Sequence, residues 1–568
     1  MFTPGTAVPI YVHQIPVRNA GLQDCNVPPQ PIPSTTSRLA IRPAPTLVKV
    51  PPGQLTPGTV KTNSVPVHVP EGQGYLHGVR TGADGSIAPQ DALMLLKQGN
   101  DRFMLGTPLA TSTNGTMRKA LVEFGQAPHT AIIGCSDSRC PIETIFDAMP
   151  GELFVMRNAG NTCTHAEGSI VGSLEFSVGK LKSRLVLILG HTKCGAIYGA
   201  TNLYLDRKKG SGGRGSSSAL EALLHDLGTV AAEAENMAGR GADPDTIAAR
   251  AVKVNVFHTI NFLLKFSQGV REKVMNGEIQ LHGGIYHLES GQVEFLGQSP
   301  MQAEMLQSQV ALPLSIKGSQ ISNRGIYGVR TAADGTVPAH EALRLLKEGN
   351  ERFAVGSPIM GSIDDSMRRA LVQHGQAPHT AIIGCADSRV PIDTVFDCMP
   401  GELFTLRNAG NTCTHAEGSM IGSLEYCIGN LKTRLIFVMG HTKCGAVAGA
   451  TQAYLAGAEK QTGAGSALEC LLRDLADVAQ RAAQDLGPDV SADDITMHAI
   501  KLNVFRTMDF ILRYSPAIRE KCRLGEVELL GGIYHLETGR VQFLGCSPAQ
   551  HVLLHSSSKL PPSLSDDQ

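Results

Sequence analysis

The sequence predicts an α/β fold in two tandem copies, each a mostly parallel sheet flanked by helices. The first observation is a long internal repeat, because residues 125–169 and 375–419 differ at only seven of 45 positions. The second is that short apolar runs alternate with helical segments within each copy, which favours parallel strands joined by helices. The copies lie 250 residues apart, a period too long for a solenoid unit, so each copy is expected to be a whole domain.

The length of 568 residues also exceeds what one hydrophobic core usually serves. We expect an N-terminal arm, a first repeat, a linker, a second repeat and a C-terminal tail, with bounds 1–74, 75–300, 301–324, 325–550 and 551–568. The arm holds 14 of the 32 prolines and shows no helical or strand period. That composition is typical of a disordered segment, with a transit peptide as the alternative.

Three apolar runs of the first copy are predicted to be buried strands. They are HTAIIG at 129–134, ELFVMRNAG at 152–160 and RLVLILGH at 184–191. Segments of helical character separate them, and a long one follows across 217–275. GIYHLESGQVEFLG at 284–297 is predicted to be a hairpin that turns at Ser290 and Gly291.

Composition excludes several classes of function. The net charge is −1 and no long basic blocks occur, so neither a nucleic acid nor a membrane surface is an expected partner. No apolar run reaches the roughly 18–20 residues that span a bilayer. Thirteen scattered cysteines, an odd number, argue against a disulfide framework. They favour an intracellular, reducing compartment, either cytoplasm or plastid stroma, with some thiols available to a metal.

Potential metal ligands stand at the ends of two predicted strands. Cys135 ends the first strand, and His191 ends the third, followed by Cys194. Carboxyl ends of parallel strands meet at one edge of a sheet, where sites form. Zinc accepts thiolate and imidazole, and three protein ligands leave an open position for catalysis. The alternative is core cysteines beside a histidine. The second copy repeats the set as Cys385, His441 and Cys444.

Each first cysteine begins a C-x-D-x-R segment. Asp137 is a possible fourth ligand, and Arg139 can hold a carboxylate through two hydrogen bonds. Asp137 on the metal would close the site, whereas Asp137 held by Arg139 would leave the position open. A plain surface ion pair is the alternative.

C-x-D-x-R followed by a strand and H-x-x-C resembles the β-class carbonic anhydrases, here in a tandem-repeat form. The resemblance runs from GVRT to the VEFLG hairpin of both copies. It implies zinc-dependent, reversible hydration of carbon dioxide to bicarbonate and a proton by zinc-bound hydroxide, at one site per repeat. It also implies two zinc ions per chain, on the two ligand sets above. The implied gating dyads are Asp137 with Arg139 and Asp387 with Arg389.

The pocket resembles the plant-type branch of that family. The implied substrate-binding residues are Gln126, Phe154, Phe176 and Gly195 in the first copy, and Gln376, Phe404, Tyr426 and Gly445 in the second. Where the branch has a tyrosine, the first copy has Phe176, so we expect the missing hydroxyl to affect the activity of copy one. The chain has no tryptophan, so the inhibitory bicarbonate pocket of the allosteric bacterial branch should be absent.

The family's basic unit is a dimer whose pockets are completed across the interface. We therefore expect an intrachain pseudo-dimer in which each copy completes the other's pocket, and covalent linkage favours this pairing. A further homodimer of chains stays open. Activity is expected to rise on the alkaline side of neutral, because two thiolates cancel the charge of zinc. Rival functions are hydrolysis of carbon disulfide or carbonyl sulfide, and bicarbonate binding without catalysis. His165 and His415 are assigned to packing rather than to proton transfer.

Overall fold

The computed structural model describes residues 88–108, 115–163, 168–210, 218–239, 241–307, 338–355, 365–413, 418–457 and 466–555. All of them belong to one of the two units into which the chain divides, Val67–Gln568. The predicted arm, most of the predicted linker and tail, and both His165 and His415 lie outside the described residues.

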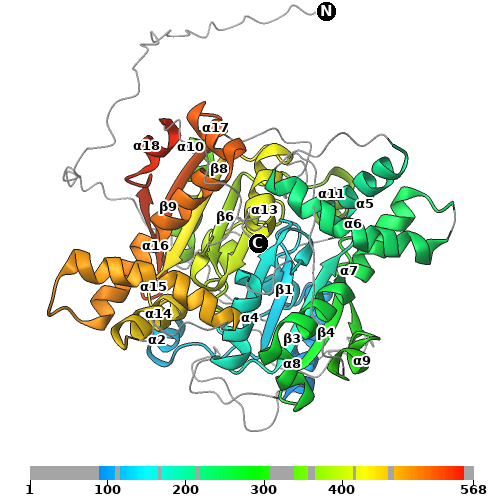
Figure 1. The fold of residues 1–568 in the computed structure, drawn as a ribbon, viewed down its shortest axis with the longest axis horizontal. Coiled ribbons are helices and arrows are strands. Elements are labelled where there is room, and N and C mark those ends of the chain that lie inside the picture. The colour runs from blue at the N-terminus through cyan, green and yellow to red at the C-terminus, as the bar shows by residue number, and fades with distance from the viewer. Residues whose placement is uncertain are drawn as a thin grey trace, which may run out of the picture. The chain divides into compact units, whose positions relative to one another are not determined.

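Ten strands form a single sheet in the order β10-β9-β8-β6-β7-β2-β1-β3-β4-β5 (Figure 1). Their bounds are β1 Thr130–Cys135, β2 Leu153–Asn158, β3 Leu185–His191, β4 Gln280–Tyr286, β5 Val293–Gly297, β6 Thr380–Cys385, β7 Leu403–Asn408, β8 Leu435–His441, β9 Glu528–His535 and β10 Arg540–Gly545. In each repeat four strands run parallel, and the last strand is antiparallel to its neighbour. The predicted mostly parallel sheet and the predicted terminal hairpin are both confirmed.

The two repeats join at the centre of this sheet. Strands β2 and β7 pair antiparallel, with Arg157 opposite Arg407. The backbone of each repeat also donates across the junction: Val155 N–H bonds the Ala386 carbonyl at 3.2 Å, and Thr405 N–H bonds the Ser136 carbonyl at 3.3 Å. The repeats therefore form the expected pseudo-dimer within one chain.

The helices flank the sheet. In the first repeat they are α1 Pro89–Leu105, α2 Gly115–Phe124, α3 Ile142–Ile145, α4 Ser169–Gly179, α5 Gly195–Lys208, α6 Ala219–Ala238, α7 Pro244–Phe266, α8 Gln268–Met275 and α9 Gln302–Gln307. In the second they are α10 Ala339–Ala354, α11 Asp365–His374, α12 Ile392–Val395, α13 Gly418–Gly429, α14 Gly445–Leu455, α15 Ala467–Leu486, α16 Ala492–Tyr514, α17 Pro516–Arg523 and α18 Gln550–His555. Helix α9 begins inside the segment predicted to be the linker.

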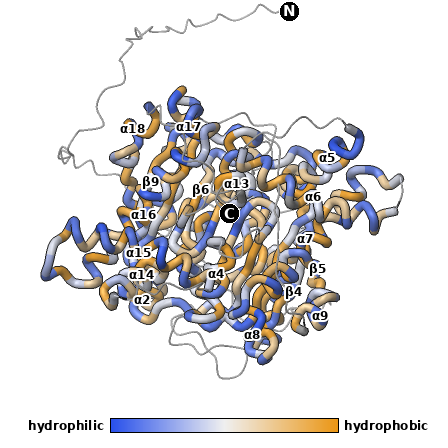
Figure 2. Tube along the Cα trace, in the orientation of Figure 1, coloured by the Kyte–Doolittle hydropathy of each residue, from blue (hydrophilic) through white to orange (hydrophobic). Residues whose placement is uncertain are grey.

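Apolar side chains fill both faces of the central strands. Every residue of β1, β2 and β3 is buried, as is every residue of their counterparts β6, β7 and β8. Figure 2 shows hydrophobic residues recurring through these strands, while hydrophilic ones gather on outer turns. Burial on both faces explains why the strands appear in the sequence as continuous apolar runs rather than as alternating patterns.

Helices of one repeat pack against helices of the other. Helix α4 packs against α15, and α13 packs against α6 (Figure 1). The contact is close because of glycine: a Cβ on Gly172 would lie 2.6 Å from the Ala467 carbonyl oxygen. Glu175 of α4 accepts a hydrogen bond from Leu468 N–H at the start of α15, at 2.8 Å. A carboxylate at that end also complements the helix dipole.

Among the described residues, none of the helices combines the length and apolar character needed to cross a bilayer.

Candidate metal centres and active sites

The predicted ligands of each repeat converge at one edge of the sheet. Cys135 is the last residue of β1 and His191 the last of β3, and these strands are parallel neighbours. Cys194 directly precedes α5. The three donor atoms lie within 4.8 Å of one another and all three residues are buried; we call this the first site. Its counterpart, the second site, consists of Cys385, His441 and Cys444.

The donor set suits a soft divalent metal. The two sulfurs are 3.9 Å apart in both sites. Two thiolates bound tetrahedrally to zinc at 2.3 Å would lie about 3.8 Å apart. His191 Nδ1 donates to the Thr192 carbonyl at 3.0 Å, which leaves Nε2 as an acceptor. That Nε2 is buried without a hydrogen-bond partner, and the same holds for His441. Both nitrogens can therefore act as ligands of a zinc ion together with the two sulfurs.

The two thiols of each site have pKa values shifted in opposite directions. Cys444 precedes helix α14, and a hydrogen bond from Cys385 lowers its pKa, while burial raises the pKa of Cys385. In the first site the pKa of Cys135 is lowered against the effect of burial, and hydrogen bonding to Cys135 raises that of Cys194. Gly410 N–H also donates to Cys385 Sγ at 3.3 Å.

Each aspartate is held by its arginine. Arg139 donates from Nε to Asp137 Oδ1 at 2.8 Å and from Nη2 to Oδ2 at 2.7 Å. Burial alone would raise the pKa of Asp137, but the guanidinium charge holds it at about 2. Oδ2 nevertheless lies only 3.8 Å from His191 Nε2. Asp387 and Arg389 repeat this arrangement, and the pKa of Asp387 is also about 2. Both carboxylates are therefore turned to arginine beside the ligand atoms.

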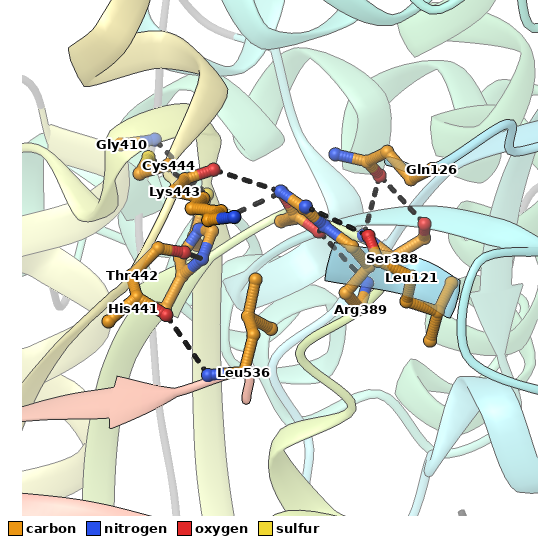
Figure 3. A network of polar contacts seen from close by, with 12 residues as sticks. Leu121, Gln126, Ser388, Arg389, Gly410, His441, Thr442, Lys443, Cys444 and Leu536 are labelled. Atoms are coloured by element: carbon orange, nitrogen blue, oxygen red, sulfur yellow. Dashed lines mark hydrogen bonds and ion pairs between the residues drawn. The ribbon is translucent and has the colours of Figure 1, made fainter. Parts of the chain in front are cut away.

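The turn that joins the second and third ligands of each site also accepts a hydrogen bond from the arginine of that site's dyad. Lys443 has a φ of +54°, a left-handed conformation that is unusual for a residue with a side chain. Its carbonyl accepts a hydrogen bond from Arg389 Nη2 at 3.0 Å, which Figure 3 shows beside His441 and Cys444. Lys193 does the same for Arg139 with a φ of +53°. The ligand turn and the dyad are thus fixed together.

The predicted glutamines cross between the repeats. Gln126 Oε1 accepts hydrogen bonds from Ser388 N–H at 2.9 Å and Ser388 Oγ at 2.7 Å, as Figure 3 shows. Gln376 accepts the equivalent bonds from Ser138, at 2.9 and 2.6 Å. Each glutamine therefore belongs to the site of the other repeat.

The aromatic residues cross as well, which corrects one expectation. A Cβ built on Gly445, the residue after ligand Cys444, would lie 3.2 Å from Phe176 Cζ. Phe176 thus lines the second site. Tyr426 instead interacts electrostatically with Asp137 and Arg139 of the first site. The expected place of the missing hydroxyl is therefore corrected: it is missing from the site whose ligands copy two supplies, and its effect on activity stays a prediction.

The remaining predicted pocket residues lie beside these groups. The rings of Phe154 and Phe176 have centroids 6.1 Å apart, and those of Phe404 and Tyr426 6.0 Å. Gly195 begins α5 directly after ligand Cys194, as Gly445 begins α14 after Cys444.

Two buried arginines at the junction were missed by the sequence analysis. Arg157 is 1% exposed and donates to the backbone carbonyls of Cys135 and Asp137, both at 2.8 Å. Its third nitrogen lies 3.5 Å from Asp393 of the other repeat. In the second site, Arg407 donates to the backbone carbonyls of Cys385 and Asp387. It also forms an ion pair with Glu143 of the first repeat. The available signal was an arginine inside the apolar run LFVMRN, where a charge is costly unless it is paired.

Within the described part of the chain, a third group of possible ligands lies in the second repeat and has no counterpart in the first. His379, Cys398 and Glu402 have donor atoms within 4.8 Å of one another. His379 Nδ1 forms a hydrogen bond with Thr380 Oγ1 at 2.8 Å. The residue that corresponds to Cys398 in the first repeat is Ala148.

Three comparisons with known proteins found similar chains. A family model described as "Carbonic anhydrase" matches residues 130–293 and 380–541. "Carbonic anhydrase 2" of Mycobacterium tuberculosis is 34% identical over 201 residues, 35% of this chain and 89% of its own. The Saccharomyces cerevisiae "Carbonic anhydrase" is 32% identical over 168 residues, 29% of this chain and 73% of its own. A solved structure of the "Coccomyxa beta-carbonic anhydrase in complex with acetazolamide" is 32% identical, covering 32% of this chain and 78% of that one, with a TM-score of 0.28.

Proposed function

This chain belongs to the carbonic anhydrase family. We propose that it hydrates carbon dioxide reversibly at two zinc sites, one at the ligand set of each repeat. The observation that carries the proposal is that both repeats bring two buried thiols and an unpartnered imidazole nitrogen together beside a carboxylate latched to arginine. Each feature occurs twice, so the proposal covers both sites rather than one active site and one relic.

Cys135, His191 and Cys194 would hold one zinc ion, and Cys385, His441 and Cys444 the other. A zinc ion with three protein ligands would supply Lewis-acid activation of a water molecule, which hydration of carbon dioxide requires. The arginines contribute by keeping the aspartates away. While Arg139 holds both oxygens of Asp137, that carboxylate is kept from the fourth ligand position.

The glutamines would orient the substrate. Because Gln376 Oε1 already accepts two hydrogen bonds from Ser138, its amide orientation is fixed and its Nε2 group is the part that donates. A donor held in this way stabilises negative charge that develops on a substrate oxygen. Gln126 would serve the second site likewise. The aromatic pairs Phe404 with Tyr426 and Phe154 with Phe176 would form the apolar wall that accepts carbon dioxide.

The likeness of these pocket residues to the plant-type branch is part of the same proposal. It is supported by the glutamine, phenylalanine, tyrosine and glycine positions, all of which lie next to one of the two ligand sets.

Zinc counting together with stopped-flow hydration of carbon dioxide tests the proposal on wild type, Cys135→Ala, Cys385→Ala and the double variant. We expect two zinc ions per wild-type chain, one in each single variant and none in the double variant. Hydration should persist in both single variants and disappear only in the double variant. Wild type with two bound zinc ions and no hydration would sink the proposal.

A further inference from the structure

The first and second sites have the same ligands, dyad and glutamine but differ in the aromatic residue that the other repeat supplies. The first site receives Tyr426 from α13, and the second receives Phe176 from α4. Both rings are held by the same kind of neighbour, Phe404 or Phe154. The phenylalanine carbon that would carry the hydroxyl of a tyrosine, Cζ, is the atom directed at Gly445.

The hydroxyl of Tyr426 is available as a hydrogen-bond donor in the first site. Tyr426 is 4% exposed, and its helix α13 is held on the first repeat by Ser423 Oγ, which accepts a hydrogen bond from Ala159 N–H at 2.9 Å, as Ser173 of α4 accepts one from Ala409 N–H of the second repeat. A phenol, with an ordinary pKa of about 10, is protonated at neutral pH and can donate a hydrogen bond. A neutral donor inside a pocket of low polarity binds an anion more strongly than it binds uncharged carbon dioxide.

We propose that the two active sites differ in anion binding: Tyr426 makes the first site the tighter binder of bicarbonate and similar planar oxyanions, and Phe176 leaves the second site weaker. This inference rests on the proposed function. Removing one hydrogen bond to a charged ligand typically weakens binding by roughly tenfold or more, so the dissociation constants should differ by about that factor. The chain would then keep one site working when bicarbonate or another anion occupies the other.

Two further differences lie nearby and must be separated from this effect. Ser136 and Cys140 of the first site correspond to Ala386 and Val390 of the second. Exchanging only the aromatic residue, in both directions, isolates the hydroxyl.

The experiment uses two single-site backgrounds of the full chain, Cys385→Ala for the first site and Cys135→Ala for the second. Calorimetric titration of the zinc-loaded proteins with sodium nitrate, an unreactive planar oxyanion, gives the dissociation constants. Stopped-flow assays give KM for bicarbonate. We expect nitrate to bind the first site about tenfold more tightly than the second. KM for bicarbonate should likewise be lower at the first site. Tyr426→Phe should remove the advantage, and Phe176→Tyr should confer it on the second site.

Tyr204→Phe is the matched control, since that hydroxyl bonds Glu235 outside both sites. Equal nitrate affinities in the two backgrounds, or no change in Tyr426→Phe, would overturn the inference while leaving the proposed function intact. Because Tyr426→Phe removes a single oxygen atom, the test does not depend on whether Phe176→Tyr folds. If neither zinc-loaded background hydrates carbon dioxide, the proposed function fails, and the inference fails with it.

Discussion

Gln376 of the second repeat accepts two hydrogen bonds from Ser138 of the first, through the backbone N–H at 2.9 Å and the hydroxyl at 2.6 Å. Ser138 lies between Asp137 and Arg139 in the sequence, so the glutamine is bonded to the residue that separates the two members of the first dyad. Neither repeat therefore forms a complete site by itself. Each repeat supplies a ligand set and a dyad, and the other repeat supplies the glutamine and one aromatic ring of that site.

The crossed glutamines give a direct kinetic prediction. In the Cys385→Ala background, which keeps the first site, Gln376→Ala should lower hydration by about 100-fold, because one fixed donor to developing negative charge is lost. Gln126→Ala in the same background should have little effect, because Gln126 serves the second site. Stopped-flow hydration with zinc counting measures both.

The reciprocal background gives the control. In Cys135→Ala, which keeps the second site, the sensitivity should be reversed, with Gln126→Ala severe and Gln376→Ala mild. If each glutamine instead mattered to the ligand set of its own repeat, the crossed arrangement would be wrong.

Much of each site could be predicted because it is encoded locally. Cys135 and His191 end apolar runs, and parallel strands bring such ends to one edge. The three-residue spacing from His191 to Cys194 then fixes the third ligand. Identical spacing in the second copy, around Cys385 and His441, made the assignment specific.

What could not be predicted depends on contacts between distant segments. The C-x-D-x-R pattern does not say which aromatic ring lies beside it, and for that reason the missing hydroxyl of Phe176 was expected to affect copy one. The sequence also did not predict the role of residues 205–250 and 455–500, which follow the H-x-x-C turn of each repeat. Helices α6 and α15 lie largely within them and pack against α13 and α4 of the opposite repeat. Hydrophobic periodicity predicts that a helix buries a face but not what covers it.

The latch on Asp137 predicts the effect of removing its arginine. Arg139→Ala in the Cys385→Ala background should lower hydration at least tenfold with one zinc ion still bound, because the freed carboxylate lies 3.8 Å from the ligand nitrogen of His191 and can take the open position. Hydration rate and zinc content are measured on the same sample. The exposed Arg207→Ala serves as the control. Unchanged hydration would show that the ion pair does not govern access to the metal.

The junction arginine predicts a loss of stability as well as of metal. Arg157→Met would leave two backbone carbonyls and Asp393 without their buried partner. Breaking such a pair typically costs about 3–5 kcal/mol of unfolding free energy. We expect a lower midpoint in guanidinium chloride and weaker zinc retention at the first site. Arg184→Met, which removes an exposed hydrogen bond to the Glu278 carbonyl, should change neither. Equal effects of the two variants would contradict the structural role of Arg157.

The partial burial of His258 on α7 predicts a pH dependence of stability. Burial lowers the pKa of His258 below its ordinary value of 6.5, although Glu233 opposes the shift. The unfolded chain therefore takes up the proton more readily, so the stabilising contribution is complete above about pH 6.5 and is lost as the pH falls towards the folded pKa. Denaturation midpoints at pH 8 and pH 5.5 should differ less in His258→Gln than in wild type. Metal release contributes equally to both proteins and cancels in this comparison, and the exposed His551→Gln should behave like wild type. A His258→Gln variant with the full wild-type pH dependence would show that this histidine carries none of it.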